Sequence, residues 1–316
     1  MPTTERTPEI LYDALGYRIE RYHTSKNTRG LIYTFTPFMF KKIDSLGFGV
    51  AFLLSEGFDV VSFKCINDSW FQKLPRDTIE NVAKIGSDYS FIASYGSSMG
   101  GFAAIAFSDL LQVKYCIAIS PQFSITQDFD RRWHAQAEKI ENWNYNIAPG
   151  GCKGTDLVLV YDDTLEKDRI QVEHIKSTLS PRSVREIRAS LSGHPTGYFL
   201  TETSQISSFI SSLLKLDLNI NIEFKWSKVK KSRNYMSSLG RYALQKDRLK
   251  LSTLAFSQAI KLAPDNIGYR MQISQPLHRL GRTPDAIDHI KHALSLNPDN
   301  LQLRRRLLLL TGNDTE

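Results

Sequence analysis

Residues 90–106 read SFIASYGSSMGGFAAIA: an apolar strand-like run, a tight glycine turn, and small residues suited to a closely packed helix. The turn, Gly-Ser-Ser-Met-Gly, matches the pattern G-x-S-x-G. Glycine is expected at positions 96 and 100, because a Cβ there would collide with neighbouring backbone. The pattern predicts that Ser98 stands between a strand and the N-terminus of a helix, where its hydroxyl can serve as a nucleophile.

The residues on either side of Ser98 have different roles in this interpretation. The backbone N–H of Met99 is expected to point at a substrate oxygen as that oxygen gains negative charge, assisted by the helix dipole. Ser97 is the alternative hydroxyl, but it occupies a variable position of the pattern. Ser98 is therefore the predicted nucleophile.

Short β-like runs alternate with helix-like runs up to about residue 215. Strands are expected at 31–35, 59–63, 89–95, 115–119, 156–161 and 183–188, and helices at 41–56, 75–85, 99–111, 168–179 and 201–214. Such alternation predicts a doubly wound α/β fold, in which a mostly parallel sheet is covered by helices on both faces. In sheets of this kind the ligand site lies beyond the carboxyl ends of the strands.

A polar and aromatic segment, about residues 122–155, interrupts the alternation. It is interpreted either as an inserted lid over the strand ends or as an irregular loop with some helix. Arg131 and Arg132 in this segment are candidate substrate-binding residues for an anionic group, the alternative being ordinary surface arginines. Trp70 is a third candidate, which either lines the mouth of the site or fills a gap in the core.

The C-terminal part has a different pattern. AIKLAPDN at 259–266 recurs as ALSLNPDN at 293–300, an offset of 34 residues. This spacing resembles that of tetratricopeptide (TPR) repeats, which form one helical hairpin per period. The sequence predicts a first domain over 1–220 and an all-α, TPR-like region over 221–316. The repeats are expected at about 233–266 and 267–300, with a capping helix at 301–310.

Charge is distributed unevenly along the chain. The net charge is +7, yet residues 221–316 hold 17 Lys and Arg against 8 Asp and Glu, a balance of +9. An acidic partner could use this excess, although a solvated helical face explains it equally. No nucleic-acid-binding motif accompanies the basic residues, so a nucleic-acid partner is not expected.

Cysteine usage and apolar runs bear on the compartment. Cys65, Cys116 and Cys152 are odd in number and widely spaced, which favours neither a disulfide framework nor a zinc site. The start of the chain lacks the apolar run of a secretory signal, and the longest apolar stretch is too short to span a bilayer. These features predict a cytoplasmic protein without a membrane span.

The sequence predicts no metal and no other cofactor. His289 and His292 share a helix face, but no third ligand accompanies them. The phosphate-cradling patterns G-x-x-x-x-G-K-[ST] and G-x-G-x-x-G are absent.

The region from about Leu31 to Leu214 resembles the α/β-hydrolase superfamily, on the strand–turn–helix setting of its G-x-S-x-G. The run from Trp70 to Gln122 looks like a bacterial group that couples such a domain to TPRs or to cell-surface polysaccharide enzymes. The resemblance implies ester or thioester chemistry and the chain order Ser, acid, His. His194 lies after the last strand, in the loop where this fold places its histidine, and the other six histidines fit less well.

The acid and the second oxyanion donor follow from the same resemblance. Asp162 comes directly after the strand at 156–161, and esterases often use the first Asp of a Tyr-Asp pair at this strand end. Asp163 is the runner-up, and Asp168 is expected to cap the following helix. The second donor should come from the loop after 31–35, from Thr36 or Phe38, because the intervening proline has no N–H.

The implied activity is hydrolysis of an ester or thioester through a Ser-His-Asp triad and an acyl-enzyme, on a small-molecule or glycan acyl ester. Two alternatives stay open. One is a docking protein that binds a protein partner through its repeats and carries an inactive hydrolase domain. The other is an acyltransferase or deacetylase accessory to surface-polysaccharide synthesis.

Overall fold

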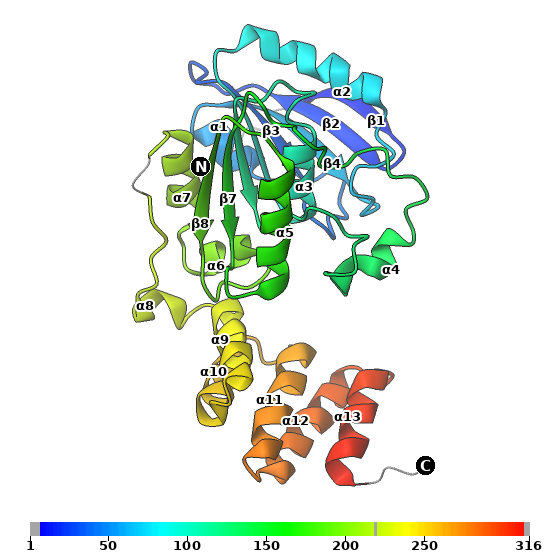
Figure 1. Cartoon of the computed structure of the whole chain (residues 1–316), viewed down its shortest axis with the longest axis vertical. Helices are drawn as coiled ribbons and strands as arrows, with labels where there is room; N and C mark the ends of the chain where they lie inside the picture. The colour runs from blue at the N-terminus through cyan, green and yellow to red at the C-terminus, as the bar shows by residue number, and fades with distance from the viewer. Residues whose placement is uncertain (1–6, 218–219, 313–316) are drawn as a thin grey trace. The chain divides into compact units, whose positions relative to one another are not determined.

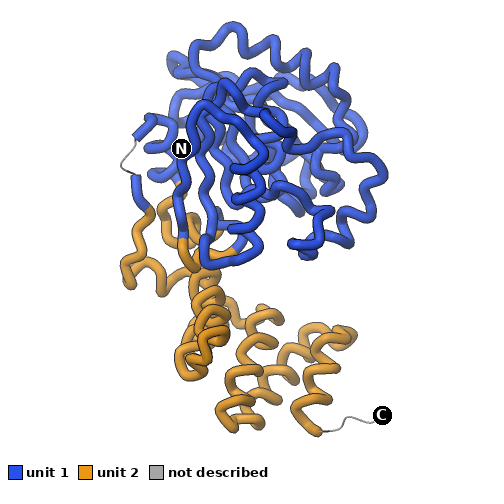
Figure 2. The backbone as a smooth tube through the Cα atoms, viewed as in Figure 1, with its two compact units in different colours: residues 1–189, 194–197, 207–221 blue, residues 190–193, 198–206, 222–316 orange. Residues whose placement is uncertain are grey.

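The computed structural model describes residues 7–217 and 220–312, which form two compact units (Figure 2). The first unit contains the described residues up to Ala189, together with His194–Gly197 and Ser207–Asn221. The second contains Ser190–Gly193, Tyr198–Ile206 and the described residues from Ile222 onward. Each unit has its own core, and each is described separately below.

An eight-stranded sheet forms the centre of the first unit (Figure 1). Its order is β1-β2-β4-β3-β5-β6-β7-β8, with β3 to β8 parallel and β2 antiparallel to both β1 and β4. The strands are β1 Glu9–Ala14, β2 Tyr17–Tyr22, β3 Leu31–Phe35, β4 Asp59–Cys65, β5 Ile92–Ser97, β6 Tyr115–Ile119, β7 Asp156–Tyr161 and β8 Ser183–Arg188. The predicted α/β class with a mostly parallel sheet is confirmed.

Helices lie between the strands, as the alternation predicts. They are α1 Val50–Ser55, α2 Arg76–Ala83, the 3₁₀ helix η1 Lys84–Asp88, α3 Met99–Ala106 and α5 Glu166–Thr178. Two more helices, α6 Thr196–Glu202 and α7 Ile206–Leu214, follow the last strand. Helix α3 packs on β3, β5 and β6, and α5 packs on β7. This places the start of α3 at the carboxyl ends of the central strands.

The helix expected over 41–56 is wrong in its first half, because only Val50–Ser55 is helical. Gly49, which precedes α1, has a φ of 72°, a left-handed conformation that stops a helix from extending backward through it. A Cβ at Gly47 would lie 1.8 Å from the hydroxyl of Ser62 on β4. The chain before α1 is therefore shaped by close contact with the sheet.

The segment at 122–155 is mostly irregular, with two short helical turns, η2 Arg131–Trp133 and α4 His134–Ala137. This secondary structure is that of a loop with some helix, and a role of the segment as a lid stays a prediction. Several of its apolar side chains join the core of the first unit, among them Ile125, Ile140, Tyr145 and Ile147. The segment is thus packed onto the unit along much of its length.

The three cysteines are free and buried, as small core residues. Burial raises the pKa of the Cys116 thiol to about 11 and that of Cys152 to about 12. Both thiols are therefore protonated and unreactive at neutral pH.

Helical hairpins form most of the second unit, preceded by the short α8 Trp226–Val229. The hairpin helices are α9 Arg233–Gln245, α10 Leu249–Leu262, α11 Ile267–Arg279, α12 Thr283–Leu296 and the final α13 Leu301–Thr311. The predicted TPR-like pairing, α9 with α10 and α11 with α12, is confirmed.

The contacts that join successive hairpins repeat with the same 34-residue period. The side chain of Asn266 caps α11 and that of Asn300 caps α13. Arg270 Nε donates to the carbonyl of Pro264 at 2.8 Å, and Arg304 Nε donates to that of Pro298 at 2.8 Å. The sequence repeat is thus a structural repeat down to its capping and linking hydrogen bonds.

Small residues bring the paired helices together. A Cβ at Gly240 would lie 2.8 Å from the buried ring of Phe256, so α9 and α10 meet at a glycine. Ser252, at a position where TPRs usually have alanine, donates its hydroxyl to the carbonyl of Gly240 at 2.8 Å. The serine therefore keeps the close approach and satisfies its own polar group.

Within the described ranges, no helix is long and apolar enough to cross a membrane.

Candidate active site

Ser98 lies in a strained turn between β5 and α3. Its φ is 54°, a conformation that is costly for a residue with a Cβ and is found mainly where surrounding structure enforces it. A Cβ at Gly96 would lie 2.1 Å from the carbonyl oxygen of Gly100, and one at Gly100 would lie 2.3 Å from that of Phe35. The two glycines are therefore needed, as predicted, and they hold Ser98 at the carboxyl end of the sheet.

His194 lies in the loop that follows β8, with its Nε2 2.9 Å from Ser98 Oγ. Its Nδ1 lies 2.9 Å from Asp168 Oδ2. Because a carboxylate oxygen can only accept, the imidazole proton lies on Nδ1, and Nε2 is left to accept the Ser98 hydroxyl. The three side chains form one directed chain of hydrogen bonds, and they are buried or nearly so, with only 3% of Ser98 exposed.

The carboxylate beside His194 belongs to Asp168, and the choice of Asp162 is corrected accordingly. Asp162 is buried at the end of β7, where it accepts from the Thr164 backbone N–H at 3.0 Å and its hydroxyl at 2.6 Å. It shapes the turn that leads into α5. The runner-up, Asp163, directly follows it in sequence, whereas the two ring nitrogens of His194 bond to Ser98 and Asp168.

Asp168 lies in the first turn of α5 and does not cap it. The capping position is that of Leu165, and α5 begins at Glu166. Asp168 is 2% exposed, so its carboxylate is stabilised by protein groups and hardly at all by water. One carboxylate oxygen accepts from His194, and the other accepts from Arg132 Nη2 at 2.8 Å.

Arg132 is bound by two carboxylates, so its assignment as a substrate-binding residue is corrected. Besides its bond to Asp168, Arg132 makes a bidentate contact with Asp130, Nε to Oδ1 at 2.8 Å and Nη2 to Oδ2 at 2.7 Å. Burial alone would raise the pKa of the Asp130 carboxyl, but the bonds from Arg132 and Gln171 hold it below its usual value. The guanidinium is thus a fixed part of the site.

Arg131, the other predicted arginine, lies on the surface with 74% of its side chain exposed. Its Nε lies 3.7 Å from Asp128 Oδ1, and an exposed ion pair of this kind contributes little to the stability of the fold. A role for Arg131 toward substrate stays a prediction.

Aromatic rings surround the imidazole. Trp133 lies with its ring centroid 5.9 Å from that of His194, and Phe38 packs on Trp133 at 5.0 Å and on Trp70 at 5.7 Å. Trp70 is 1% exposed and donates from Nε1 to Gln122 Oε1 at 3.1 Å. Of its two predicted roles the structure favours filling the core, whereas Trp133, which sequence reasoning missed, faces His194.

The candidate oxyanion donors divide into two kinds. Met99 is the first residue of α3, so its N–H has no intrahelical acceptor. The N–H of Thr36 donates to the Phe63 carbonyl at 3.1 Å, so the assignment of this N–H as a donor is corrected. Its hydroxyl accepts from Cys65 N–H at 3.0 Å and keeps its own proton, so donation by this hydroxyl stays a prediction. The Phe38 N–H has no acceptor within residues 7–217 and 220–312 and stays the second candidate.

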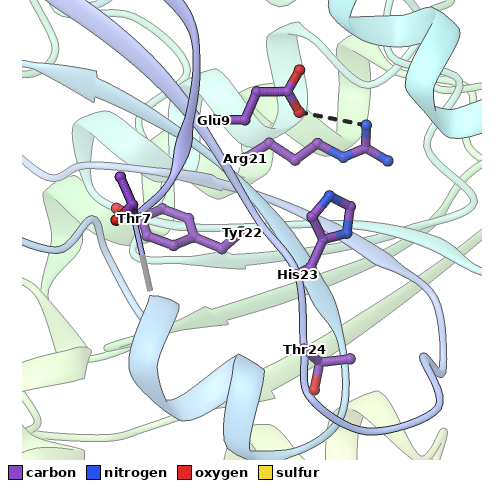
Figure 3. Close-up of a pocket in the computed structure, with 6 residues that line it drawn as sticks. All are labelled: Thr7, Glu9, Arg21, Tyr22, His23 and Thr24. Atoms are coloured by element: carbon purple, nitrogen blue, oxygen red, sulfur yellow. Dashed lines mark ion pairs between the residues drawn. The ribbon is translucent and has the colours of Figure 1, made fainter. Parts of the chain in front are cut away.

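A separate pocket of about 450 Å³ lies at the other end of the sheet (Figure 3). Thr7, Glu9, Arg21, Tyr22, His23 and Thr24 line it, and Arg21 forms an ion pair with Glu9. Tyr22 pairs with Val60 near the amino end of β4. This pocket therefore lies at the end of the sheet opposite to the end that holds Ser98. None of the predicted site residues lines it.

Metal binding finds no support in the described part of the chain, where no cluster of three or more His, Cys, Asp or Glu could hold an ion.

Comparison with protein-family models and with curated protein sequences found no match. Among solved structures, a sugar hydrolase (YeeB) from Lactococcus lactis matches 67% of this chain and 98% of its own, with 14% identity and a TM-score of 0.50. The chain joins an α/β-hydrolase fold to TPR-like helical repeats.

Two further matches cover the two parts of the chain separately. A protein of unknown function from Staphylococcus aureus subsp. aureus Mu50 covers 67% of this chain, with 98% of its own matched, 13% identity and a TM-score of 0.49. The Arabidopsis OM64 TPR domain covers 37% of this chain, with 87% of its own matched, 15% identity and a TM-score of 0.24.

Proposed function

We propose that the protein is a serine hydrolase that cleaves an ester or thioester through an acyl-enzyme on Ser98. The observation that carries this proposal is the hydrogen-bonded chain from Ser98 Oγ to His194 Nε2, and from Nδ1 to Asp168, each link 2.9 Å long. The strained φ of Ser98 supports it, since strain of this kind is concentrated at active sites.

The reaction follows from where each proton lies. Ser98 Oγ attacks the acyl carbon while its proton passes to His194 Nε2, and the Nδ1 proton stays in its bond to Asp168. The carbonyl oxygen becomes an oxyanion that accepts from the N–H groups of Met99 and Phe38. The Nε2 proton then moves to the departing alkoxide or thiolate as its bond to carbon breaks.

Release of the acyl group reverses these roles. Water attacks the acyl carbon, gives one proton to Nε2, and the Ser98 oxygen leaves and takes that proton back. The products are a carboxylic acid and the free enzyme. An acceptor hydroxyl in place of water would make the protein an acyltransferase, and a small-molecule or glycan acyl ester is the proposed substrate class.

The helical repeats favour a second role, the docking of a protein partner. Large apolar side chains on these helices are exposed, among them Leu254, Leu301 and Leu309. Helical repeat arrays commonly present an extended binding surface to a partner. The buried, unpaired cysteines support a reducing, cytoplasmic compartment for both roles.

Labelling with a fluorophosphonate probe tests the proposed activity. We expect the wild type to form a covalent adduct at Ser98, and Ser98→Ala and His194→Ala to form none. Ser97→Ala is the matched control, because Ser97 precedes the nucleophile and makes no bond to His194. A folded wild type that does not label, or a Ser98→Ala variant that labels as fast, would overturn the proposal and leave docking as the supported role.

A further inference from the structure

The acid of the triad is held from the side opposite to His194. Asp168 Oδ2 faces His194 Nδ1, whereas Oδ1 accepts from Arg132 Nη2 at 2.8 Å. The remaining donors of Arg132 on that side are bound by Asp130, which is fully buried. A bidentate contact of this type fixes the plane of the guanidinium and therefore the direction in which Nη2 points.

We propose that Arg132 is a positioning residue for the triad acid, which fixes Asp168 so that one oxygen meets the histidine. Asp130 in turn fixes Arg132. This inference rests on the proposed function. It adds a role for the irregular segment at 122–155, since Asp130 and Arg132 both come from that segment.

The connection between this segment and α5 is reinforced one helical turn further on. Gln171, which is fully buried, accepts at Oε1 from the backbone N–H of Phe123 at 2.7 Å and of Ser124 at 3.1 Å. Its Nε2 donates to Asp130 Oδ2 at 3.0 Å. Asp168 and Gln171 lie three residues apart and so on one face of α5, which makes the whole contact a single built surface.

Charge explains why an arginine is suited to this position. The groups in contact with Asp168 are His194 from the loop after β8 and Arg132 from η2, and Arg132 also contacts Asp130. On α5 itself Arg169 pairs with Glu173. Two buried carboxylates side by side would repel each other, and the arginine between them reduces their net charge to that of one.

Substitution at Arg132, with an exposed arginine of α5 as control, tests the proposal. We expect Arg132→Gln to slow fluorophosphonate labelling by about 10- to 100-fold, since displacement of a reacting group by about 1 Å can cost about 100-fold. Arg169→Gln removes an arginine of α5 whose contact with Glu173 is an exposed ion pair, and it should label at the wild-type rate. Methylguanidinium should restore much of the lost rate to Arg132→Ala, whereas equal methylammonium should not.

The pH profile of labelling gives a signature that a merely structural role would not produce. Without the guanidinium, two carboxylates favour the protonated imidazole, so the acidic limb of the profile should move to higher pH in Arg132→Gln. Asp130→Asn leaves the guanidinium to Asp168 alone and should move the limb to lower pH. Wild-type rate in Arg132→Gln, or a limb that moves in neither variant, would overturn the proposal.

A readout independent of activity separates this proposal from the proposed function. The Nδ1 proton of His194, held by Asp168, should give a low-field resonance in the proton NMR spectrum that His194→Ala removes. We expect the resonance to be kept in Arg169→Gln and lost or shifted in Arg132→Gln. If the wild type does not label but the resonance responds in this way, the positioning stands and the hydrolase proposal fails. An unchanged resonance in Arg132→Gln overturns the positioning whatever the labelling shows.

Discussion

Replacement of Asp168 by Asn has a result that the structure predicts in atomic terms. In the wild type Oδ1 accepts from Arg132 and Oδ2 accepts from His194. Asn has one oxygen and one NH₂ group, so it can keep only one of these two bonds. Because Arg132 has donors only, the amide oxygen must face the guanidinium, and the NH₂ group is directed at His194 Nδ1.

An NH₂ group opposite Nδ1 reverses the hydrogen-bonding roles of the two imidazole nitrogens. Nδ1 must then accept, so the imidazole proton moves to Nε2, and Nε2 can no longer take the proton of Ser98. In triads of this type the same exchange lowers kcat by about 10⁴-fold, because the tautomer is wrong while the geometry is intact. That loss corresponds to about 5 kcal/mol of activation free energy.

The assay is the rate of fluorophosphonate labelling, with Asp162→Asn as the matched control. Asp162 accepts from the N–H and hydroxyl of Thr164, and the single oxygen of Asn can still accept the backbone bond. We therefore expect Asp162→Asn to label within a few-fold of the wild type, and Asp168→Asn to be slower by about 10⁴-fold. A large loss at Asp162 with none at Asp168 would refute the assignment of the acid.

Two further predictions concern stability. For Gly240→Ala we expect the free energy of unfolding in urea to fall by up to about 2 kcal/mol, because crowding of the buried Phe256 ring exceeds the gain in helix propensity. Gly268→Ala is the control and should be close to neutral, because the added Cβ meets only the Asn266 amide oxygen. Equal losses of stability in the two variants would contradict this packing. For Asp130 the folded-state pKa is lowered, so its ion pair adds stability above the unfolded-state pKa of about 4 and loses it as pH falls through the folded-state pKa. The stability difference between wild type and Asp130→Asn should therefore narrow below about pH 4, and a difference that is constant from pH 7 to pH 3 would speak against the ion pair.

Local patterns were enough to predict the parts of the site that depend on adjacent residues. The turn at Ser98 is specified by two glycines within five positions, each of which is needed against backbone. His194 was implied by the resemblance, which places the histidine in the loop after the last strand of the parallel sheet. At Ser98 the chain immediately around the residue determines where the side chain goes.

The acid could not be predicted in this way, because three aspartates follow β7 within seven residues. Which of them meets His194 depends on Arg132, which lies in a distant irregular segment. The backbone N–H of Thr36 is not free to be an oxyanion donor for a similar reason. Its N–H is taken by the carbonyl of Phe63, a pairing between β3 and β4 that exists only in the assembled sheet.

The first hairpin, β1 with β2, lies outside the predicted strands. Glu20 on β2 and Lys64 on β4 are both buried and form an ion pair. Residues 17–20 alternate apolar and polar as a half-buried strand does, but the sequence does not show that the glutamate is buried. Paired charges of this kind are satisfied by each other, which only the structure reveals.

The position of the acid also limits how the site can open. An acid at the end of β7 would leave the segment at 122–155 free to move as a lid. Here the same segment supplies Asp130 and Arg132, and Arg132 holds Asp168. Lifting η2 away from α5 would break those bonds and leave two buried carboxylates without their cation, at a large cost in free energy. Substrate should therefore reach Ser98 while η2 stays in place, so that Trp133, next to the arginine, remains a fixed wall beside His194.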